Sequence, residues 1–246
     1  MSAEDGSSVF LSVYGEVTGR HQGSFVPEEA ALGISEATGI GIEDIRAALH
    51  HPPAEGTLYP DAVRFLAQLA ETEGQYVSIW TQGEMATSQG GAGYQLKKVG
   101  QAGISGLLDP GWRTRNSLMG LPRVLGDIYR KSDALASIMP SLLEGGFETV
   151  VVVDDKPANH VMSRQALEDE GWGATDHYLM ARSNNGNGHD DDFPVHSVKS
   201  FDEIPLEDRA GSRVLWLVDL DYTLIDHRRV VEQYSRRIDE LSGTAA

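Results

Sequence analysis

The sequence predicts an α/β protein with a Rossmann-like parallel sheet. Two observations favour this fold class. From residue 57 onward, short apolar runs typical of strands alternate with segments of helical periodicity. The strand-like runs are also almost continuously apolar, which is expected of parallel strands that helices cover on both faces.

Residues 1–82 contain three predicted helices and the first predicted strand. Residues 9–14 are a short apolar run whose state the pattern leaves open. A helix is expected from Pro27, because proline followed by acidic residues suits a first helical turn, and residues 42–49 are expected to form another. Between residues 60 and 71, apolar side chains recur on one helical face after Pro60. Residues 76–81 (YVSIWT) are expected to form a strand that ends at Thr81.

The rest of the chain continues the alternation. Residues 94–101 are predicted to be a helix and residues 104–108 a short strand. A helix at 131–144 should end at a pair of glycines, and residues 149–153 (TVVVV) are the clearest strand. A helix at 159–170, a strand at 178–182 and a polar loop at 183–192 should follow. The last two elements are a buried strand at 214–218 (VLWLV) and a charged helix at 228–241.

Composition restricts the class of function. A chain of 246 residues can bury a full core, and the absence of cysteine leaves only oxygen and imidazole to hold any metal. A net charge of −17 argues against binding to nucleic acid. No apolar run approaches the ~18 residues that span a bilayer, and the first residues are acidic rather than basic, so we expect a cytoplasmic protein with no membrane partner.

Polar side chains follow three of the predicted strands. Asp219 and Asp221 come after the strand at 214–218, where a spacing of two points both side chains the same way. Thr81 ends one strand, and Asp154 and Asp155 end another. Carboxyl ends of parallel strands are where α/β sheets bind ligands, and an all-oxygen cluster suits Mg²⁺. The alternative is that turns and strand-end loops are polar in any protein.

These residues also form a recognisable set. The sequence DLDYT at 219–223 resembles the DxDxT signature of the haloacid dehalogenase (HAD) superfamily. Thr81 is similar to the family's second motif, Lys131 to its third, and Asp154–Asp155 to its fourth in the double-aspartate form. Lys97 and Lys98 are alternatives to Lys131.

The order of these motifs departs from the family, in which DxDxT comes first. Here it comes last, so the resemblance implies a circularly permuted HAD core at residues 57–227. The helical cap would consist of residues 1–56 together with 228–246, and would carry both termini. The strand at 214–218 should then lie between the strands that end at Thr81 and at Asp155.

The resemblance implies a magnesium-dependent phosphatase that hydrolyses a small phosphorylated metabolite through an aspartyl-phosphate. The residues assigned in this way are the nucleophile Asp219, the general acid and base Asp221, and the phosphoryl-binding Thr81 and Lys131. Mg²⁺ would be held by Asp219, the backbone carbonyl of Asp221 and Asp155, with Asp154 as a further ligand or as support.

Three questions stay open at this stage. A phosphomutase or another phosphoryl transferase of the same fold, and a non-catalytic HAD-like domain that binds a partner, are the alternative functions. Either a monomer or a homodimer is expected. His160, close after the acidic pair, either contacts substrate or covers the start of a helix.

Overall fold

The structure is a computed structural model that describes residues 6–21, 25–83, 85, 92–107, 116–122, 124–127, 130–182 and 195–244. The polar segment at 183–192 lies outside the described residues. The chain forms two compact units. The helical unit consists of Met1–Thr57, Gly83–Ala102 and His227–Ala246, and the α/β unit of Leu58–Gln82 and Gly103–Asp226. The cap expected from the sequence did not include residues 83–102.

The α/β unit is built on a six-stranded sheet in which every pairing is parallel, in the order β2-β1-β6-β3-β4-β5. This confirms the predicted α/β, Rossmann-like fold class. The strands are β1 (Gln75–Gln82), β2 (Val124–Asp127), β3 (Thr149–Asp154), β4 (Thr175–Met180), β5 (His196–Val198) and β6 (Val214–Asp219).

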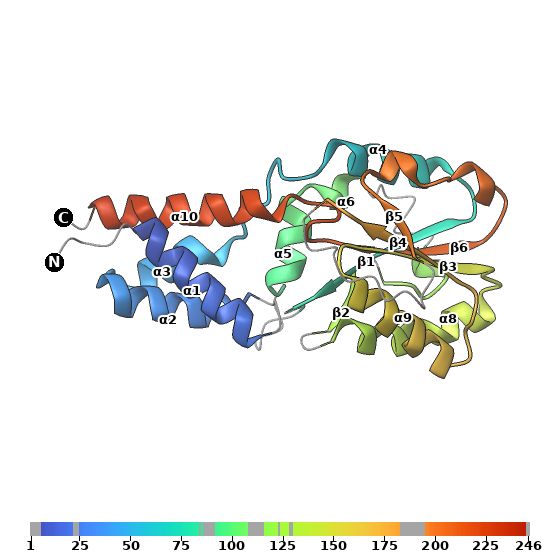
Figure 1. Cartoon of the computed structure of the whole chain (residues 1–246), viewed down its shortest axis with the longest axis horizontal. Coiled ribbons are helices and arrows are strands. Elements are labelled where there is room, and N and C mark those ends of the chain that lie inside the picture. Colours follow the sequence, from blue (N-terminus) through green and yellow to red (C-terminus); the bar gives the residue numbers. More distant parts are fainter. Residues whose placement is uncertain are drawn as a thin grey trace. The chain divides into compact units, whose positions relative to one another are not determined.

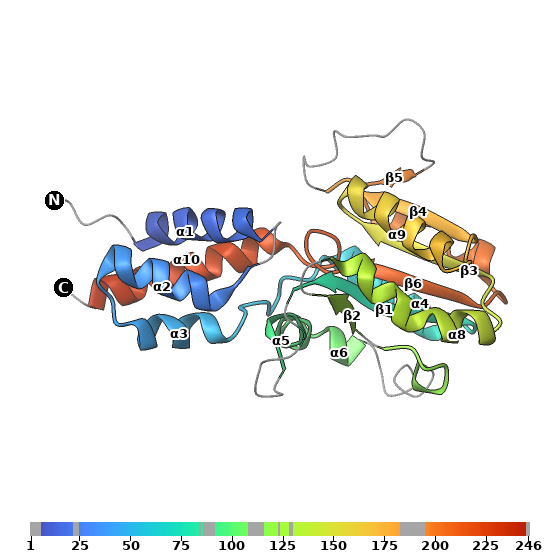
Figure 2. The same cartoon turned by 90° about the horizontal axis from the view of Figure 1, so that it is seen from below.

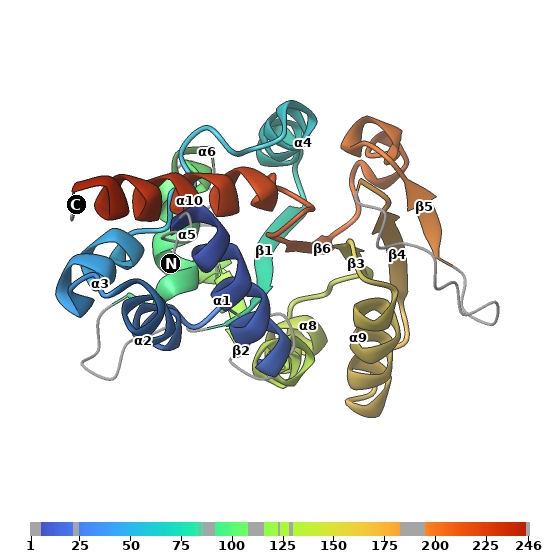
Figure 3. The ribbon, with the colours of Figure 1, turned by 60° about the vertical axis from the view of Figure 1, so that its left-hand side comes forward.

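The last strand in sequence is a central strand in space. β6 pairs with β1 on one side and with β3 on the other, as predicted, and Figure 3 shows it between them. Every residue of β6 is buried. Its five apolar residues are therefore covered on both faces, which explains why the run does not alternate with polar residues.

Helices cover the two faces of this sheet (Figure 1). On one face lies α4 (Pro60–Glu71), whose Phe65 ring makes an edge contact with Trp216 of β6. The opposite face is covered by the 3₁₀ helix η1 (Lys131–Ile138), α8 (Met139–Glu144) and α9 (Pro157–Asp169). The remaining short elements are α6 (Ile104–Leu107), η2 (Phe201–Glu203) and η3 (Glu207–Arg209).

The segment at 104–108 was predicted as a strand, and this is wrong. Residues 104–107 form the helix α6, in which the backbone N–H groups of Gly106 and Leu107 donate to the carbonyl of Gly103 at 3.0 and 3.4 Å. The two glycines favour this local turn because they are poor strand formers.

Three other elements differ from the prediction. Residues 131–144 are not one α-helix but η1 followed by α8, and Pro140 stands in the first turn of α8, where its missing N–H costs least. β4 covers 175–180 rather than 178–182. The short strands β2 and β5 were not predicted, because runs of four and three residues carry too little pattern.

The helical unit contains α1 (Gly6–Arg20), α2 (Pro27–Thr38), α3 (Ile42–His50), α5 (Tyr94–Gln101) and α10 (His227–Thr244). The first and last helices pack side by side (Figure 2), and the backbone N–H of Ser7 donates to Asp239 Oδ1 at 2.7 Å. The open run at 9–14 is therefore part of a helix. Among the described residues, no helix has the length and apolarity needed to cross a membrane.

Candidate active site

The carboxyl ends of β1, β6 and β3 place three side chains in one row. Trp80 of β1 lies opposite Asp219 of β6, and Val153 of β3 lies opposite Val218, so that Asp154 and Asp219 each come one residue later. Neighbouring residues at the same level of a parallel sheet point to the same face. Trp80, Asp219 and Asp154 therefore all face the layer that contains η1.

Lys131, the first residue of η1, reaches this row. Its Nζ lies 2.6 Å from Asp219 Oδ1, donates to Asp154 Oδ2, and lies 4.3 Å from the centroid of the Trp80 ring. Only 3% of Lys131 is exposed. Burial alone would lower the pKa of its ammonium, but the carboxylates of Asp154 and Asp219 raise it overall. The lysine thus stays charged between two acids.

Asp154 is held by several donors. Besides Lys131, the backbone N–H of Lys156 and the amide of Asn159 donate to its Oδ1 at 2.8 and 2.9 Å. Burial works to raise the pKa of Asp154, yet the Lys131 ammonium holds it below its ordinary value. Asp154 is therefore an anchored, ionised carboxylate.

The pKa values of Asp155 and Asp219 are raised, whereas that of Asp154 is lowered. Burial, and then the charges of Asp219 and Asp154, raise the pKa of Asp155 to about 8. Burial also raises the pKa of Asp219 to about 7, with Lys131 opposing and with Asp154 and Asp221 adding to the rise. Without a cation, the site therefore favours protonation of acids that are otherwise ionised at neutral pH.

This arrangement fits a divalent cation. Asp154, Asp155 and Asp219 each offer a carboxylate oxygen, and these oxygens lie within 4.8 Å of one another. Asp155 Oδ2 is buried with no hydrogen-bond partner among the described residues. When all are ionised, the three carboxylates and Lys131 carry two net negative charges, which a divalent cation would balance. The all-oxygen donor set suits Mg²⁺.

Asp221 stands at the edge of this cluster, and Thr81 lies in the neighbouring strand β1. The Asp221 carboxylate is close enough to raise the pKa of Asp219, but it is not one of the three clustered ligands. It follows β6 in a turn where the N–H groups of Leu224 and Ile225 donate to Leu220 O, at 3.1 and 3.0 Å. Thr81 is buried and directly follows Trp80 in β1.

The turn contains a backbone outlier. Tyr222, inside the DLDYT motif, has φ of 60°, the left-handed region that non-glycine residues rarely adopt. Such strain tends to occur where a loop must point its side chains in a particular direction.

The two lysines that were alternatives to Lys131 do not belong to the α/β unit. Lys97 and Lys98 lie on α5 of the helical unit, and Lys97 Nζ is 3.4 Å from His50 Nε2.

Two contributors were missed by sequence reasoning. No sequence signal marks Trp80, because its role depends on pairing with a strand that comes 134 residues later, at Val214. Asn159 had a usable signal, since an amide two residues into a helix after an acidic pair can reach back to it. His160 is fully buried against Asp154 O, so it does cover the start of α9.

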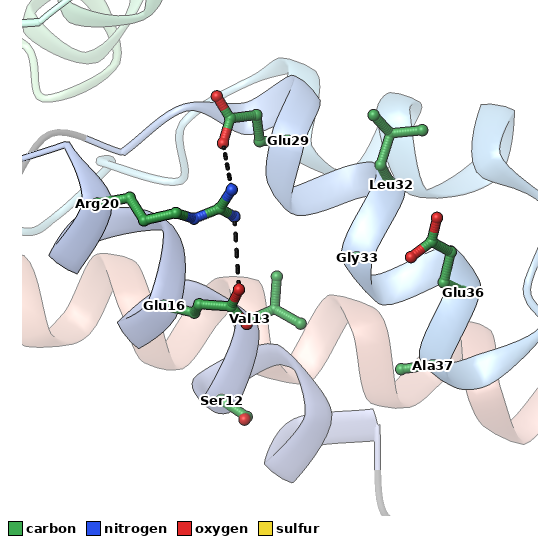
Figure 4. Close-up of a pocket in the computed structure, with 9 residues that line it drawn as sticks. All are labelled: Ser12, Val13, Glu16, Arg20, Glu29, Leu32, Gly33, Glu36 and Ala37. Carbon is green, nitrogen blue, oxygen red and sulfur yellow. Dashed lines mark ion pairs between the residues drawn. The ribbon is translucent and has the colours of Figure 1, made fainter.

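A groove of about 750 Å³ lies elsewhere, on the helical unit between α1 and α2 (Figure 4). Arg20 bridges Glu16 and Glu29, and Glu36 lines the same groove. Arg20 already pairs with two of these acids, so its charge is balanced within the groove. Among the described residues, the acids whose oxygens converge closely enough to hold a metal ion are those beside Lys131, and this cluster is the candidate site.

The fold and this cluster define a class: an α/β, Rossmann-like protein with carboxylates and a lysine at the carboxyl ends of its central strands. Comparisons with protein-family models, with curated proteins and with solved structures found no match to this chain.

Proposed function

We propose that this protein is a magnesium-dependent phosphatase that hydrolyses a small phosphorylated metabolite through an aspartyl-phosphate on Asp219. One observation carries the proposal: Lys131 binds Asp219 at 2.6 Å beside Asp155, whose Oδ2 has no partner among the described residues. The nucleophile Asp219 thus lies close to Lys131, whose charge can bind the phosphoryl group. Asp155 beside them has an oxygen available to a metal ion. The resemblance to the HAD superfamily supports the same assignment.

Each residue has a chemical part to play. An oxygen of Asp219 attacks phosphorus, and the bond from phosphorus to the leaving oxygen breaks as Asp221 gives that oxygen a proton. Asp221 then takes a proton from water, whose oxygen displaces Asp219 and releases phosphate. Lys131, with Thr81, stabilises the negative charge on the phosphoryl oxygens during both transfers.

Asp219, Asp155 and Asp154 are the carboxylates that would hold Mg²⁺. When bound, this ion would screen the charge between an anionic nucleophile and an anionic phosphate. Lys131 contributes to the same end, because its positive charge lies between Asp219 and Asp154. An acidic protein can in this way accept an anionic substrate.

The experiment is a panel of phosphorylated metabolites and p-nitrophenyl phosphate, assayed with Mg²⁺ and with EDTA. We expect release of phosphate that EDTA abolishes and Mg²⁺ restores. Asp219→Asn should lower turnover at least ~10³-fold, because the covalent nucleophile is lost. Asp169→Asn, at the exposed end of α9, is the matched control and should leave turnover unchanged.

Asp221→Asn distinguishes the role of Asp221 as general acid and base from that of Asp219 as nucleophile. Turnover should fall roughly 10²–10⁴-fold. The fall should be smallest with p-nitrophenyl phosphate, because its leaving group p-nitrophenolate needs little protonation. Beryllofluoride with Mg²⁺ should bind the wild type and not Asp219→Asn. Near-normal turnover in Asp219→Asn, or full activity in EDTA, contradicts the proposal.

A further inference from the structure

Two buried histidines lie behind the acidic pair. His160 of α9 places its Nε2 3.2 Å from the backbone carbonyl oxygen of Asp154, and its Nδ1 3.2 Å from Nδ1 of His177. His177 belongs to β4, where it lies opposite Val152. Exposure is 0% for His160 and 3% for His177, so neither ring is placed to meet substrate.

The hydrogen bonds define the proton positions. A carbonyl oxygen only accepts, so the Nε2 of His160 must carry a hydrogen. In a neutral His160 the Nδ1 then accepts, and the Nδ1 of His177 must be the donor. Both rings are buried, and burial favours their neutral form. The pair thus forms a directed chain from His177 through His160 to Asp154 O.

The acceptor of this chain belongs to the peptide group that joins Asp154 to Asp155. Because a peptide group is planar, fixing its carbonyl oxygen also fixes the direction of the N–Cα bond of Asp155. The two acids differ in how they are held. The Asp154 carboxylate has donors of its own in Lys131, the Lys156 N–H and Asn159, whereas Asp155 Oδ2 has no protein partner among the described residues.

We propose that His160 and His177 are positioning residues that orient Asp155 as a Mg²⁺ ligand, by fixing the peptide plane between Asp154 and Asp155. This inference rests on the metal site of the proposed function. It adds that the affinity for the metal depends on two side chains that touch neither metal nor substrate. Support of this kind is typically worth a factor of 10–100 in metal affinity.

The test compares variants that keep the hydrogen bond with variants that lose it. His160→Gln can still donate to Asp154 O, and His177→Asn can still donate toward His160, while His160→Leu and His177→Leu cannot. Mg²⁺ binding is measured by titration calorimetry on the full chain. Ser163→Ala is the matched control, since it removes a buried hydrogen bond at 3.0 Å to the backbone oxygen of His160 but leaves the Asp154 peptide untouched.

The leucine variants should bind Mg²⁺ about 10-fold or more weakly, with the glutamine and asparagine variants and Ser163→Ala close to the wild type. Wild-type affinity in His160→Leu, or equal weakening in Ser163→Ala, overturns the positioning role while leaving the metal site standing. A wild-type protein that binds no Mg²⁺ overturns the proposed function itself, so the two failures are distinct.

A second measurement covers the case in which a leucine variant does not fold. Nitrogen-15 NMR of the wild-type imidazoles should show His160 protonated only at Nε2 and His177 only at Nδ1. A His160 protonated at Nδ1 contradicts the directed chain and overturns the inference, whatever the variants do.

Discussion

Trp80 contacts Lys131 at both ends of the lysine. The indole Nε1–H donates to the backbone carbonyl of Lys131 at 2.8 Å, and the lysine ammonium lies 4.3 Å from the centroid of the Trp80 ring. Both residues are buried. A long flexible side chain is therefore held in one position before any ligand arrives, which reduces the entropy lost when it acts.

Lys131→Met tests the charge balance of the site. Methionine preserves an apolar contact with the Trp80 ring but leaves Asp154 and Asp219 buried without their cation. We expect a loss of about 3–5 kcal/mol in the free energy of unfolding near neutral pH. The loss should shrink in acid, where the carboxyls take up protons.

Denaturant unfolding followed by tryptophan fluorescence measures this, because Trp80, Trp172 and Trp216 belong to the α/β unit. Lys156→Met, with an exposed side chain two residues from Asp154, is the control and should change little. Equal losses at neutral and acid pH would contradict the electrostatic account.

Asp155→Asn should stabilise the metal-free protein. The pKa of Asp155 is raised to about 8 from an ordinary value of 3.8, so the folded state binds a proton that the unfolded state releases between these pH values. The stability that this carboxyl contributes is present below its unfolded pKa and is lost as pH rises through about 8. Near pH 8.5 we expect Asp155→Asn to be more stable by about 0.5–2 kcal/mol.

Unfolding across this pH range, with EDTA and then with Mg²⁺, measures the effect. Mg²⁺ should stabilise the wild type and not Asp155→Asn, since only the wild type keeps the full ligand set. An equal response of both proteins to Mg²⁺ would show that Asp155 is no ligand.

Asp61, at the start of α4, should stabilise the α/β unit at pH values above about 4. It accepts hydrogen bonds from Arg182 Nη1 at 2.9 Å, Ser200 Oγ at 2.9 Å and the N–H of Phe201 at 2.8 Å. Burial alone would raise its pKa, but these donors lower it to about 2. A lowered pKa contributes stability that is present above the unfolded value near 4 and is lost as pH falls toward 2.

Asp61→Asn should therefore destabilise the protein by about 3–5 kcal/mol at neutral pH, because it removes the carboxylate partner of Arg182, whose side chain is only 11% exposed. The difference from the wild type should vanish near pH 2. Asp202→Asn removes the exposed partner of Arg64 and serves as the control, with little expected effect. Equal effects of the two substitutions would rule out this role for Asp61.

Gly74→Ala should be more harmful than Gly171→Ala. Both glycines have positive φ, 81° and 88°, where alanine costs about 1–2 kcal/mol. Space distinguishes them: a Cβ at Gly74 collides with the backbone oxygen of Ser212, whereas nothing lies within 4 Å of one at Gly171. Denaturant unfolding should show Gly171→Ala near that cost and Gly74→Ala well beyond it; equal losses would contradict the steric account.

Much of this architecture could be predicted from local pattern. The helix α4 and the strand β6 begin where the sequence indicates, because Pro60 marks a helix start and five apolar residues mark a buried strand. A long apolar run or a proline specifies its element through nearby residues alone, so the element forms where the sequence predicts it. The short segment at 104–107 became a helix instead of a strand, because a few residues leave the choice to their surroundings.

The sequence by itself also determined which residues carry candidate chemistry, since acids and a threonine at strand ends are visible in the chain. Only the tertiary structure decided how they are paired. Lys131 lies between Asp154 and Asp219, Trp80 holds it in place, and His177 supports Asp154 through His160. These contacts join residues 6 to 88 positions apart. The physical reason is that strand register and helix packing, which bring such residues together, are properties of the whole sheet and not of any one segment.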